Sequence, residues 1–293
     1  MNADMTNNTN NKLFDNSHSA GDFCIFRQIP NVLRARDFRL YMADNRRLVD
    51  LWLNGGAAVL GHTPPNLLRE LKNTASRGLY APFPHFSEGR YIKALVKLFP
   101  KSRFRLYAAP PPELVSFFNS GTAGLWYPFT GTSTTAQENS QASSFAADNT
   151  PLLIPVLPGI QTWRYNLPLG LCVAASNPIC AESENLFAQL PASDNLSPIL
   201  LAVATRGVYN LLASPERATP IVPHVMNVLQ KSRWQRRGIY LTLKKEIKAE
   251  EWAALFYQFL EAGFLLPPIQ SHPLILPGEL SAGEEAKLAA VLL

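Results

Sequence analysis

The chain has 293 residues, of which 47% are hydrophobic and only 17% are charged, and its formal net charge is +5. A chain of this length can bury one large hydrophobic core or two smaller ones. The sequence contains no run of about 18 apolar residues, so a membrane-spanning helix is not expected. Because charged residues are scarce, we expect a partner subunit to cover part of the apolar surface.

The N-terminal region is predicted to pass from a disordered tail into a pair of strands. Residues 1–20 are polar, rich in asparagine and without periodicity, and they lack the apolar stretch of a signal peptide. Short apolar runs at 39–42 and 47–53 flank a turn at Asp44 and Asn45, a pattern typical of paired strands. Without a secretion signal, the protein is expected to be cytoplasmic.

Two helices are predicted next. The first follows the proline pair 64–65, carries an apolar stripe over residues 67–75 and ends near Gly78. The second covers residues 87–99, has its apolar side chains on one face and is ended by Pro100.

The middle of the chain is predicted to combine buried strands with polar loops. Residues 114–118 are predicted to form an apolar strand that opens onto a turn of small residues at 119–122. The segment 129–151 is rich in Thr, Ser, Gln, Asn and Ala and is almost uncharged, which indicates a surface loop or a disordered insert. Further buried strands are expected at 152–157 and 167–174.

Helical patterns return in the last third of the chain. Residues 198–212 are predicted to form a helix that is apolar on most faces. Apolar residues recur at helical spacing between Trp252 and Leu260, before a stop at Gly263. The run 281–284 has the sequence of a capping box and is expected to open a last helix.

The positive charge is densest in residues 231–237, which contain a single aromatic residue. This pattern favours a solvated helix end before a strand at 238–243 over a nucleic-acid interface. We therefore expect no nucleic-acid partner.

The three cysteines, Cys24, Cys172 and Cys180, are too few and too scattered for a disulfide framework. No histidine lies between His85 and His224, so Cys172 and Cys180 could supply only half of a metal site. We expect no metal site and interpret these two cysteines as buried apolar residues.

The region 41–65 carries the most specific motif. Two predicted strands lead there into Leu60-Gly61-His62-Thr63-Pro64 and a helix. This order resembles the N-terminal signature of the class III pyridoxal-phosphate-dependent aminotransferases, the glutamate-1-semialdehyde aminomutase group. Shorter matches at 259–268 and 280–285 extend the resemblance, in order, over most of residues 37–293.

The resemblance implies an α/β protein of the pyridoxal-phosphate-dependent transferase fold type I, with a truncated large domain and a small α+β domain built from both termini. The expected organisation is a tail at 1–20, the N-terminal part of the small domain with dimer helices at 21–100, and a shortened cofactor-type large domain at 101–210. The large domain contains the low-complexity insert 129–151, and residues 211–293 complete the small domain.

In the family, a Ser-Gly-Thr sequence caps a helix and binds the cofactor phosphate through amides and hydroxyls. Ser120, Gly121 and Thr122 match it, and Ser193 stands for a threonine that reaches the phosphate of the neighbouring subunit. These four residues are the expected vestigial phosphate site. The family's histidine in the Gly-His turn is structural, so His62 is interpreted as a structural residue.

The family holds pyridoxal phosphate as a Schiff base on a lysine, and an aspartate pairs with the pyridine nitrogen. In this chain no lysine lies between Lys101 and Lys231. The lysine position falls near residues 162–164, where threonine and arginine cannot form the aldimine. The strand 152–157, which should end in the aspartate, contains no acid. We therefore expect no catalytic residue and pyridoxal phosphate bound non-covalently at most.

Three functions follow from the resemblance. The first is a degenerate aminotransferase-like protein without transaminase activity, which acts through binding or dimerisation as a homodimer that buries helix faces of residues 64–99. The second is an active pyridoxal-phosphate-dependent aminotransferase or aminomutase whose lysine lies elsewhere in the chain. The third is a subunit that pairs with an intact aminotransferase and modulates it.

Overall fold

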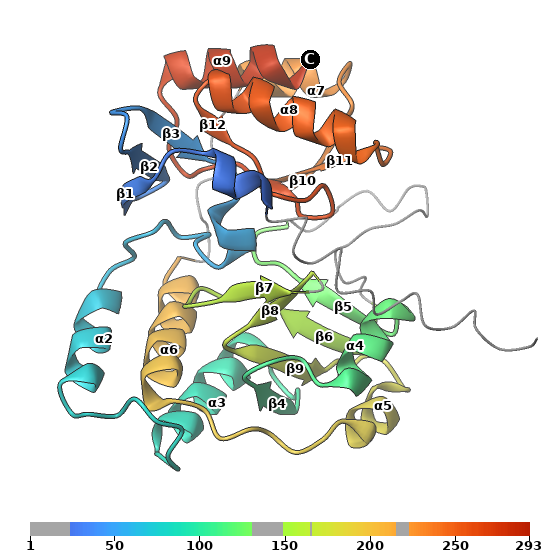
Figure 1. Ribbon diagram of the computed structural model, residues 1–293. Helices are drawn as coiled ribbons and strands as arrows, with labels where there is room; N and C mark the ends of the chain where they lie inside the picture. Colours follow the sequence, from blue (N-terminus) through green and yellow to red (C-terminus); the bar gives the residue numbers. More distant parts are fainter. Residues whose placement is uncertain (1–23, 131–148, 165, 215–222) are drawn as a thin grey trace, which may run out of the picture.

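The computed structural model describes residues 24–130, 149–164, 166–214 and 223–293, which form two lobes (Figure 1). The predicted tail at 1–20 and most of the insert at 129–151 lie outside the described residues. No helix in the part of the chain that the structure describes is both long and apolar enough to cross a membrane.

The lower lobe in Figure 1 is built on a four-stranded sheet with the order β4-β9-β6-β5. Strands β5 and β6 are parallel, and β9 runs antiparallel to both β4 and β6. A separate hairpin of β7 and β8 lies between β6 and β9 in the sequence. The strands are β4 (Phe104–Tyr107), β5 (Ala123–Trp126), β6 (Leu152–Pro155), β7 (Thr162–Arg164), β8 (Leu167–Leu169) and β9 (Cys172–Ser176).

Among the described residues, the helices of the lower lobe are α2 (Leu67–Ala75), α3 (Ser87–Leu98), α4 (Pro112–Asn119), α5 (Ser183–Gln189) and α6 (Pro198–Leu212). Helix α6 packs against α2 and α3. Its apolar face joins Tyr91 and Leu95 of α3 in one buried cluster with Val208. Gly207 lets α6 approach the chain after β6, because a Cβ there would lie 2.1 Å from the carbonyl oxygen of Pro158.

The upper lobe is built from both ends of the described chain. Strand β12 pairs in parallel with β3, which places Phe264 opposite Val49. One sheet has the order β1-β2-β3-β12 and another has the order β10-β11-β13. The elements are η2 (Cys24–Gln28), β1 (Val32–Arg36), β2 (Arg39–Met42), β3 (Arg47–Asp50), η3 (Leu53–Gly56), α7 (Pro223–Leu229), β10 (Trp234–Arg237), β11 (Tyr240–Leu243), α8 (Ala249–Glu261), β12 (Phe264–Leu265), β13 (Leu274–Ile275) and α9 (Ala282–Leu292).

Most of the strongly patterned elements are confirmed. The strand pair β2 and β3 surrounds the predicted turn, where Asn45 has a positive φ of 65°. Helices α3, α6 and α8 lie where periodicity predicted them. Helix α9 opens with the predicted capping box between Ser281 and Glu284. Burial is confirmed for Cys172, where it raises the pKa of the thiol to about 12, but Cys180 is only half-buried.

Three predictions are wrong. Residues 114–118 lie in helix α4, because Pro111 and Pro112 open a helix there and a short apolar run does not distinguish helix from strand. The basic run 231–237 follows the end of α7 at Leu229, but its last four residues form strand β10, which pairs with β11, and were wrongly assigned to the helix end. The predicted strand 167–174 is interrupted at Gly170, which has a φ of 88°.

Candidate functional site

The two lobes meet at five side chains that we call the junction cluster: Trp52, Asn54, Gln161, Trp163 and His272. The indole nitrogen of Trp163 donates to the Asn54 carbonyl oxygen at 2.9 Å, and the Asn54 amide donates to the Gln161 carbonyl oxygen at 2.8 Å. The rings of Trp163 and His272 meet edge to face with centroids 4.8 Å apart. These contacts fasten the hairpin of the lower lobe to η3 and to the segment before β13 in the upper lobe.

Trp163 packs closely against η3 because Gly55 has no side chain at the point of contact. Gly55 has a φ of 62°, and a Cβ on it would lie 2.5 Å from the Trp163 ring. Leu53 and Asn54 also have positive φ values, 47° and 50°, so the turn is held in a conformation that L-residues rarely adopt. An indole packed on this turn leaves no room for another planar ring at the same position.

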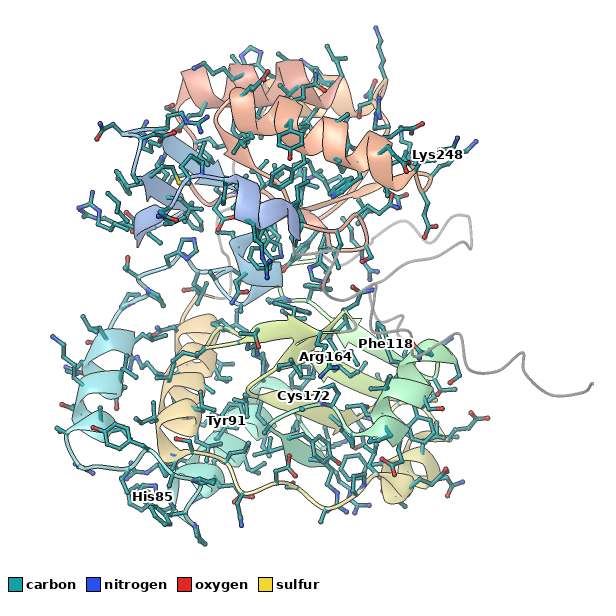
Figure 2. All side chains as sticks on the ribbon, in the orientation of Figure 1. His85, Tyr91, Phe118, Arg164, Cys172 and Lys248 are labelled. Carbon is teal, nitrogen blue, oxygen red and sulfur yellow. The ribbon has the colours of Figure 1, made fainter. Side chains whose placement is uncertain are left out.

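The expected lysine position lies on the β7–β8 hairpin, beside the junction cluster. Along β7 the exposed Thr162 and Arg164 flank the buried Trp163, as strand alternation requires. The sequence interval without lysine covers all four strands of the lower-lobe sheet, β4, β9, β6 and β5, which we call the main sheet. Figure 2 shows Arg164 on the hairpin, whereas Lys248 lies at the start of α8 in the upper lobe.

No acid follows the two parallel strands at the junction. Residues 127–130 after β5 and 156–161 after β6 contain neither aspartate nor glutamate. The carboxylate of Asp50, at the end of β3, is already used within the upper lobe. Its Oδ1 accepts from the Trp52 and Leu53 amides at 2.8 and 2.9 Å, and its Oδ2 lies 2.9 Å from His62 Nε2.

His272 is the titratable group of the junction cluster. Its Nδ1 accepts a hydrogen bond from the Trp52 indole at 3.3 Å, which places the proton of the neutral ring on Nε2. Burial lowers the pKa of His272 to about 4, so the ring is neutral at physiological pH. Within the described residues, His272 Nε2 and Gln161 Oε1 are buried without a hydrogen-bond partner. The cluster thus contains one unsatisfied donor and one unsatisfied acceptor.

The expected phosphate residues Ser120, Gly121 and Thr122 lie at the C-terminal end of α4, not at a helix N-terminus. The hydroxyls of Ser120 and Thr122 both bond to the Phe117 carbonyl oxygen, at 3.0 and 3.1 Å. They therefore satisfy the same carbonyl oxygen, in the last turn of α4. Because a helix C-terminus carries partial negative charge, the geometry expected for a phosphate cradle is not built at these residues.

The strand–turn–helix unit that the lower lobe does build runs from β4 through residues 108–111 into α4. Its turn has the sequence Ala-Ala-Pro-Pro, and Pro112 begins the helix. Three consecutive prolines remove the first of the amide donors that would bind an anion at a helix start. The Ala108 amide already donates to Asp194 Oδ2 at 2.9 Å. Glu113 adds a negative charge in the first turn, so this end of α4 also disfavours a phosphate.

Ser193 supports strand β4. Its Oγ accepts from the Leu106 amide at 3.1 Å, next to the bond between Asp194 and Ala108. Within the described residues, no hydrogen bond joins Ser193 to residues 120–122. The expected phosphate residues are therefore divided between two places in the lower lobe. Ser193 stabilises β4, and Ser120 and Thr122 stabilise the end of α4.

The two N-terminal histidines both have local partners. His62 Nε2 lies 2.9 Å from Asp50 Oδ2, and its amide donates to the Asp37 carbonyl oxygen at 2.7 Å. This geometry supports the structural interpretation of the Gly-His turn. His85 Nδ1 accepts from the Ser87 amide at 3.2 Å and lies 2.8 Å from its hydroxyl, so it caps α3. Within the described ranges, no group of three or more metal-binding side chains comes together.

Sequence reasoning missed the junction cluster. Trp163 lies between the two residues that align with the family's lysine position, and His272 lies outside the family motifs. Gly55 and Gly56, with φ values of 62° and 105°, were the available signal, because paired glycines before a predicted turn indicate close approach of another group.

Comparison with known proteins gives relatives in sequence and neighbours in structure. No family model matches the chain. It is 26% identical to an uncharacterized protein of Treponema pallidum, over 86% of this chain and 91% of that protein. It is 24% identical to an uncharacterized protein of Borreliella burgdorferi, over 90% of each chain.

The similar solved structures include aminotransferases. An ornithine δ-aminotransferase of Plasmodium falciparum superposes with a TM-score of 0.59 at 10% identity, over 89% of this chain and 91% of that chain. An acetylornithine aminotransferase of Elizabethkingia anophelis gives 0.56 at 9% identity, over 89% and 92%. An omega-transaminase of Sphaerobacter thermophilus gives 0.57 at 11% identity, over 90% of each chain.

These neighbours confirm the predicted fold class. The chain has the pyridoxal-phosphate-dependent transferase fold of type I, with a shortened large domain and a small α+β domain built from both termini.

Proposed function

We propose that this chain is a degenerate aminotransferase-like protein that does not transaminate and acts through binding, as a cytoplasmic homodimer. The observation that carries the proposal is the composition of the junction: Trp163 packs on Gly55 and His272, and the main sheet contains no lysine.

The residues of the lower lobe do not fit covalent pyridoxal phosphate chemistry. When bound, the cofactor supplies an electron sink for cleavage at an amino-acid α-carbon. That chemistry requires an amine on the protein, a carboxylate for the ring nitrogen and donors for the phosphate. The lower-lobe sheet contains no lysine, no acid occurs in residues 127–130 or 156–161, and prolines 110–112 remove some of the amide donors at the start of α4. Such groups act as a unit, so the loss of all three removes the activity.

The unsatisfied atoms of the junction cluster support binding without covalent chemistry. His272 Nε2 and Gln161 Oε1 are a donor and an acceptor that the described residues leave unpaired. Buried polar atoms of this kind require a partner, either an ordered water or a ligand. If pyridoxal phosphate binds at all, it is held non-covalently.

A second candidate is a subunit that pairs with an intact aminotransferase. Tyr80, Phe83 and Phe86 are 64%, 58% and 53% exposed and lie in the segment between α2 and α3 or next to it. An exposed aromatic surface of this kind indicates a protein partner. Co-purification of the tagged chain with an aminotransferase from its own cell extract would favour this candidate over the homodimer.

The proposal is tested by adding pyridoxal phosphate to the purified protein and removing the unbound cofactor by gel filtration. We expect no aldimine absorbance and no amino transfer from an amino acid to a keto acid above the rate of free cofactor. Pyridoxal, which lacks the phosphate, is the matched control. Retained aldimine absorbance together with amino transfer would overturn the proposal in favour of an active enzyme.

A further inference from the structure

A pocket of about 400 Å³ opens between helices α2, α3 and α6 of the lower lobe. Its charged and aromatic lining consists of Glu70 from α2, Arg90 and Lys93 from α3, and Arg206 and Tyr209 from α6. None of these residues belongs to the junction cluster or to the expected phosphate site. We call it the α2/α3/α6 pocket.

The pocket concentrates positive charge. Three cationic side chains and a single carboxylate line it, which leaves two positive charges in excess. Arg90 and Lys93 are three residues apart and therefore lie on one face of α3, and Arg206 lines the same pocket from α6. In the part of the chain that the structure describes, none of the three forms an ion pair.

The three cationic side chains, Arg90, Lys93 and Arg206, retain N–H groups that a ligand can accept from. The Arg90 guanidinium lies 4.3 Å above the ring of Phe86, which orients it and uses no N–H. Arg206 donates through Nε to the Pro65 carbonyl oxygen at 3.4 Å, and its four other N–H groups are not engaged in that bond. The Thr205 hydroxyl is not available in the same way, because it donates to Leu201 at 2.6 Å.

Two further features strengthen the positive field. Ser87 and Arg90 belong to the first turn of α3, a 12-residue helix, so its positive N-terminal end faces the same region. Lys97 lies 5.2 Å from the Tyr209 ring, which brings a fourth cation near the pocket. Like charges that line one pocket repel one another, and a bound anion offsets that repulsion because each cation attracts it.

We propose that the α2/α3/α6 pocket binds the dianionic phosphate of a small phosphate monoester. The excess of two positive charges matches a dianion. A single arginine guanidinium can bind two phosphate oxygens through two parallel hydrogen bonds. Glu70 would repel a second phosphate and can accept a hydrogen bond from a hydroxyl or amino group on the ligand. The proposed ligand is therefore a monophosphate that also bears such a group, and not a polyphosphate.

This inference does not depend on the loss of transamination, because the pocket contains none of the residues of the junction cluster. A covalent cofactor on some other lysine would overturn the proposed function and leave the phosphate site untouched.

The test is calorimetric titration of the full chain with inorganic phosphate and with glycerol 3-phosphate, at constant ionic strength in chloride. We expect saturable binding of both, with glycerol 3-phosphate the tighter, and no binding of glycerol. Arg90→Gln and Lys93→Gln should each weaken binding about tenfold, the effect of one charged hydrogen bond. Arg77→Gln, an exposed arginine outside the pocket lining, should leave the affinity unchanged.

Two results would overturn the phosphate site. One is the absence of saturable binding by the unmodified protein. The other is an equal affinity for the Arg90→Gln, Lys93→Gln and Arg77→Gln variants, which would place the bound phosphate elsewhere. Arg206→Gln is less informative on its own, because it also removes the bond to Pro65. Melting temperatures of the Arg90 and Lys93 variants equal to that of Arg77→Gln would show that the fold is intact.

Discussion

Trp163 is the residue on which the interpretation of the junction depends. It is the buried member of β7, its indole donates to Asn54, and its ring covers Gly55. Thr162 and Arg164, at the position expected for the family's lysine, are its exposed neighbours. A lysine at either position would extend from the exposed side of the strand.

We therefore predict that Thr162→Lys and Arg164→Lys do not restore transamination. Each variant supplies an amine but leaves Trp163 in place, and neither supplies a carboxylate or a phosphate cradle. The measurement is amino transfer with added pyridoxal phosphate, compared with free cofactor and with the unmodified protein. A rate above both controls would mean that the junction is closer to an active site than its residues indicate.

His272 makes the junction sensitive to acid. Its folded pKa is about 4, below the ordinary value of 6.5, because the charged ring is desolvated. Its contribution to stability is complete above about pH 6.5 and is lost as pH falls towards 4, because only the unfolded chain takes up the proton in that window. The expected loss is about 3 kcal/mol.

Urea unfolding across this pH window checks the His272 prediction. His272→Gln cannot take up a proton, so its free energy of unfolding should be lower at neutral pH and should vary less with pH. An equal pH dependence in the variant and the unmodified protein would show that another group is responsible.

At the level of elements, α9 is fastened to the N-terminal sheet by one carboxylate. Glu284 accepts from the Arg39 guanidinium at 3.1 and 2.7 Å and also completes the capping box with Ser281. The hydrogen bonds from Arg39 lower the pKa of Glu284 to about 2. This contact joins residues 245 apart in the sequence, so it ties the two ends of the upper lobe together.

We predict that Glu284→Gln destabilises the protein by about 1–2 kcal/mol at neutral pH, because glutamine keeps the cap and loses the ion pair. The folded pKa is depressed, so the contribution is present above about pH 4.5 and is lost as pH falls towards 2. The difference between the variant and the unmodified protein in urea unfolding should shrink over that range. Glu261→Gln, at the exposed end of α8, is the control and should change stability little.

The elements that the sequence predicted correctly have long periodic patterns or explicit caps, as in α6, α8 and α9. Helix α4 was mistaken for a strand because its apolar run is short and its start signal, Pro111 and Pro112, lies in a segment interpreted as loop. The Ser-Gly-Thr sequence was expected to cap a helix start, but it follows α4 and does not open a helix. For the junction cluster, the sequence indicates only a close approach at Gly55 and Gly56, because the cluster unites residues 220 apart in the sequence without a periodic pattern.

At the level of the whole molecule, one stretch of the sequence carries five of the large apolar side chains that are exposed in the described residues. Leu68, Tyr80, Phe83, Phe86 and Val96 are all between 45% and 64% exposed, and all lie within residues 64–99, the predicted dimer contact. Surface aromatics at this density are expected to be covered by another subunit.

We predict that the protein is a dimer of 32.5 kDa subunits in light scattering at low micromolar concentration. Phe83→Glu should shift it to the monomer, because a carboxylate would be buried without a partner. Ile179→Glu changes an even more exposed apolar residue, 83% exposed and outside this stretch, and should leave the dimer intact. A monomer in the unmodified protein, or equal behaviour of both variants, would contradict the predicted contact.

This chain has the aminotransferase fold, and we predict that it carries no cofactor on a lysine. Borohydride reduces a Schiff base irreversibly, so treatment of the freshly purified protein followed by peptide mass mapping tests the claim directly. We expect every recovered lysine peptide to be unmodified, since no lysine lies between Lys101 and Lys231 and Trp163 fills the junction. A stoichiometric phosphopyridoxyl group on any lysine would contradict the account and would identify the residue that performs the chemistry.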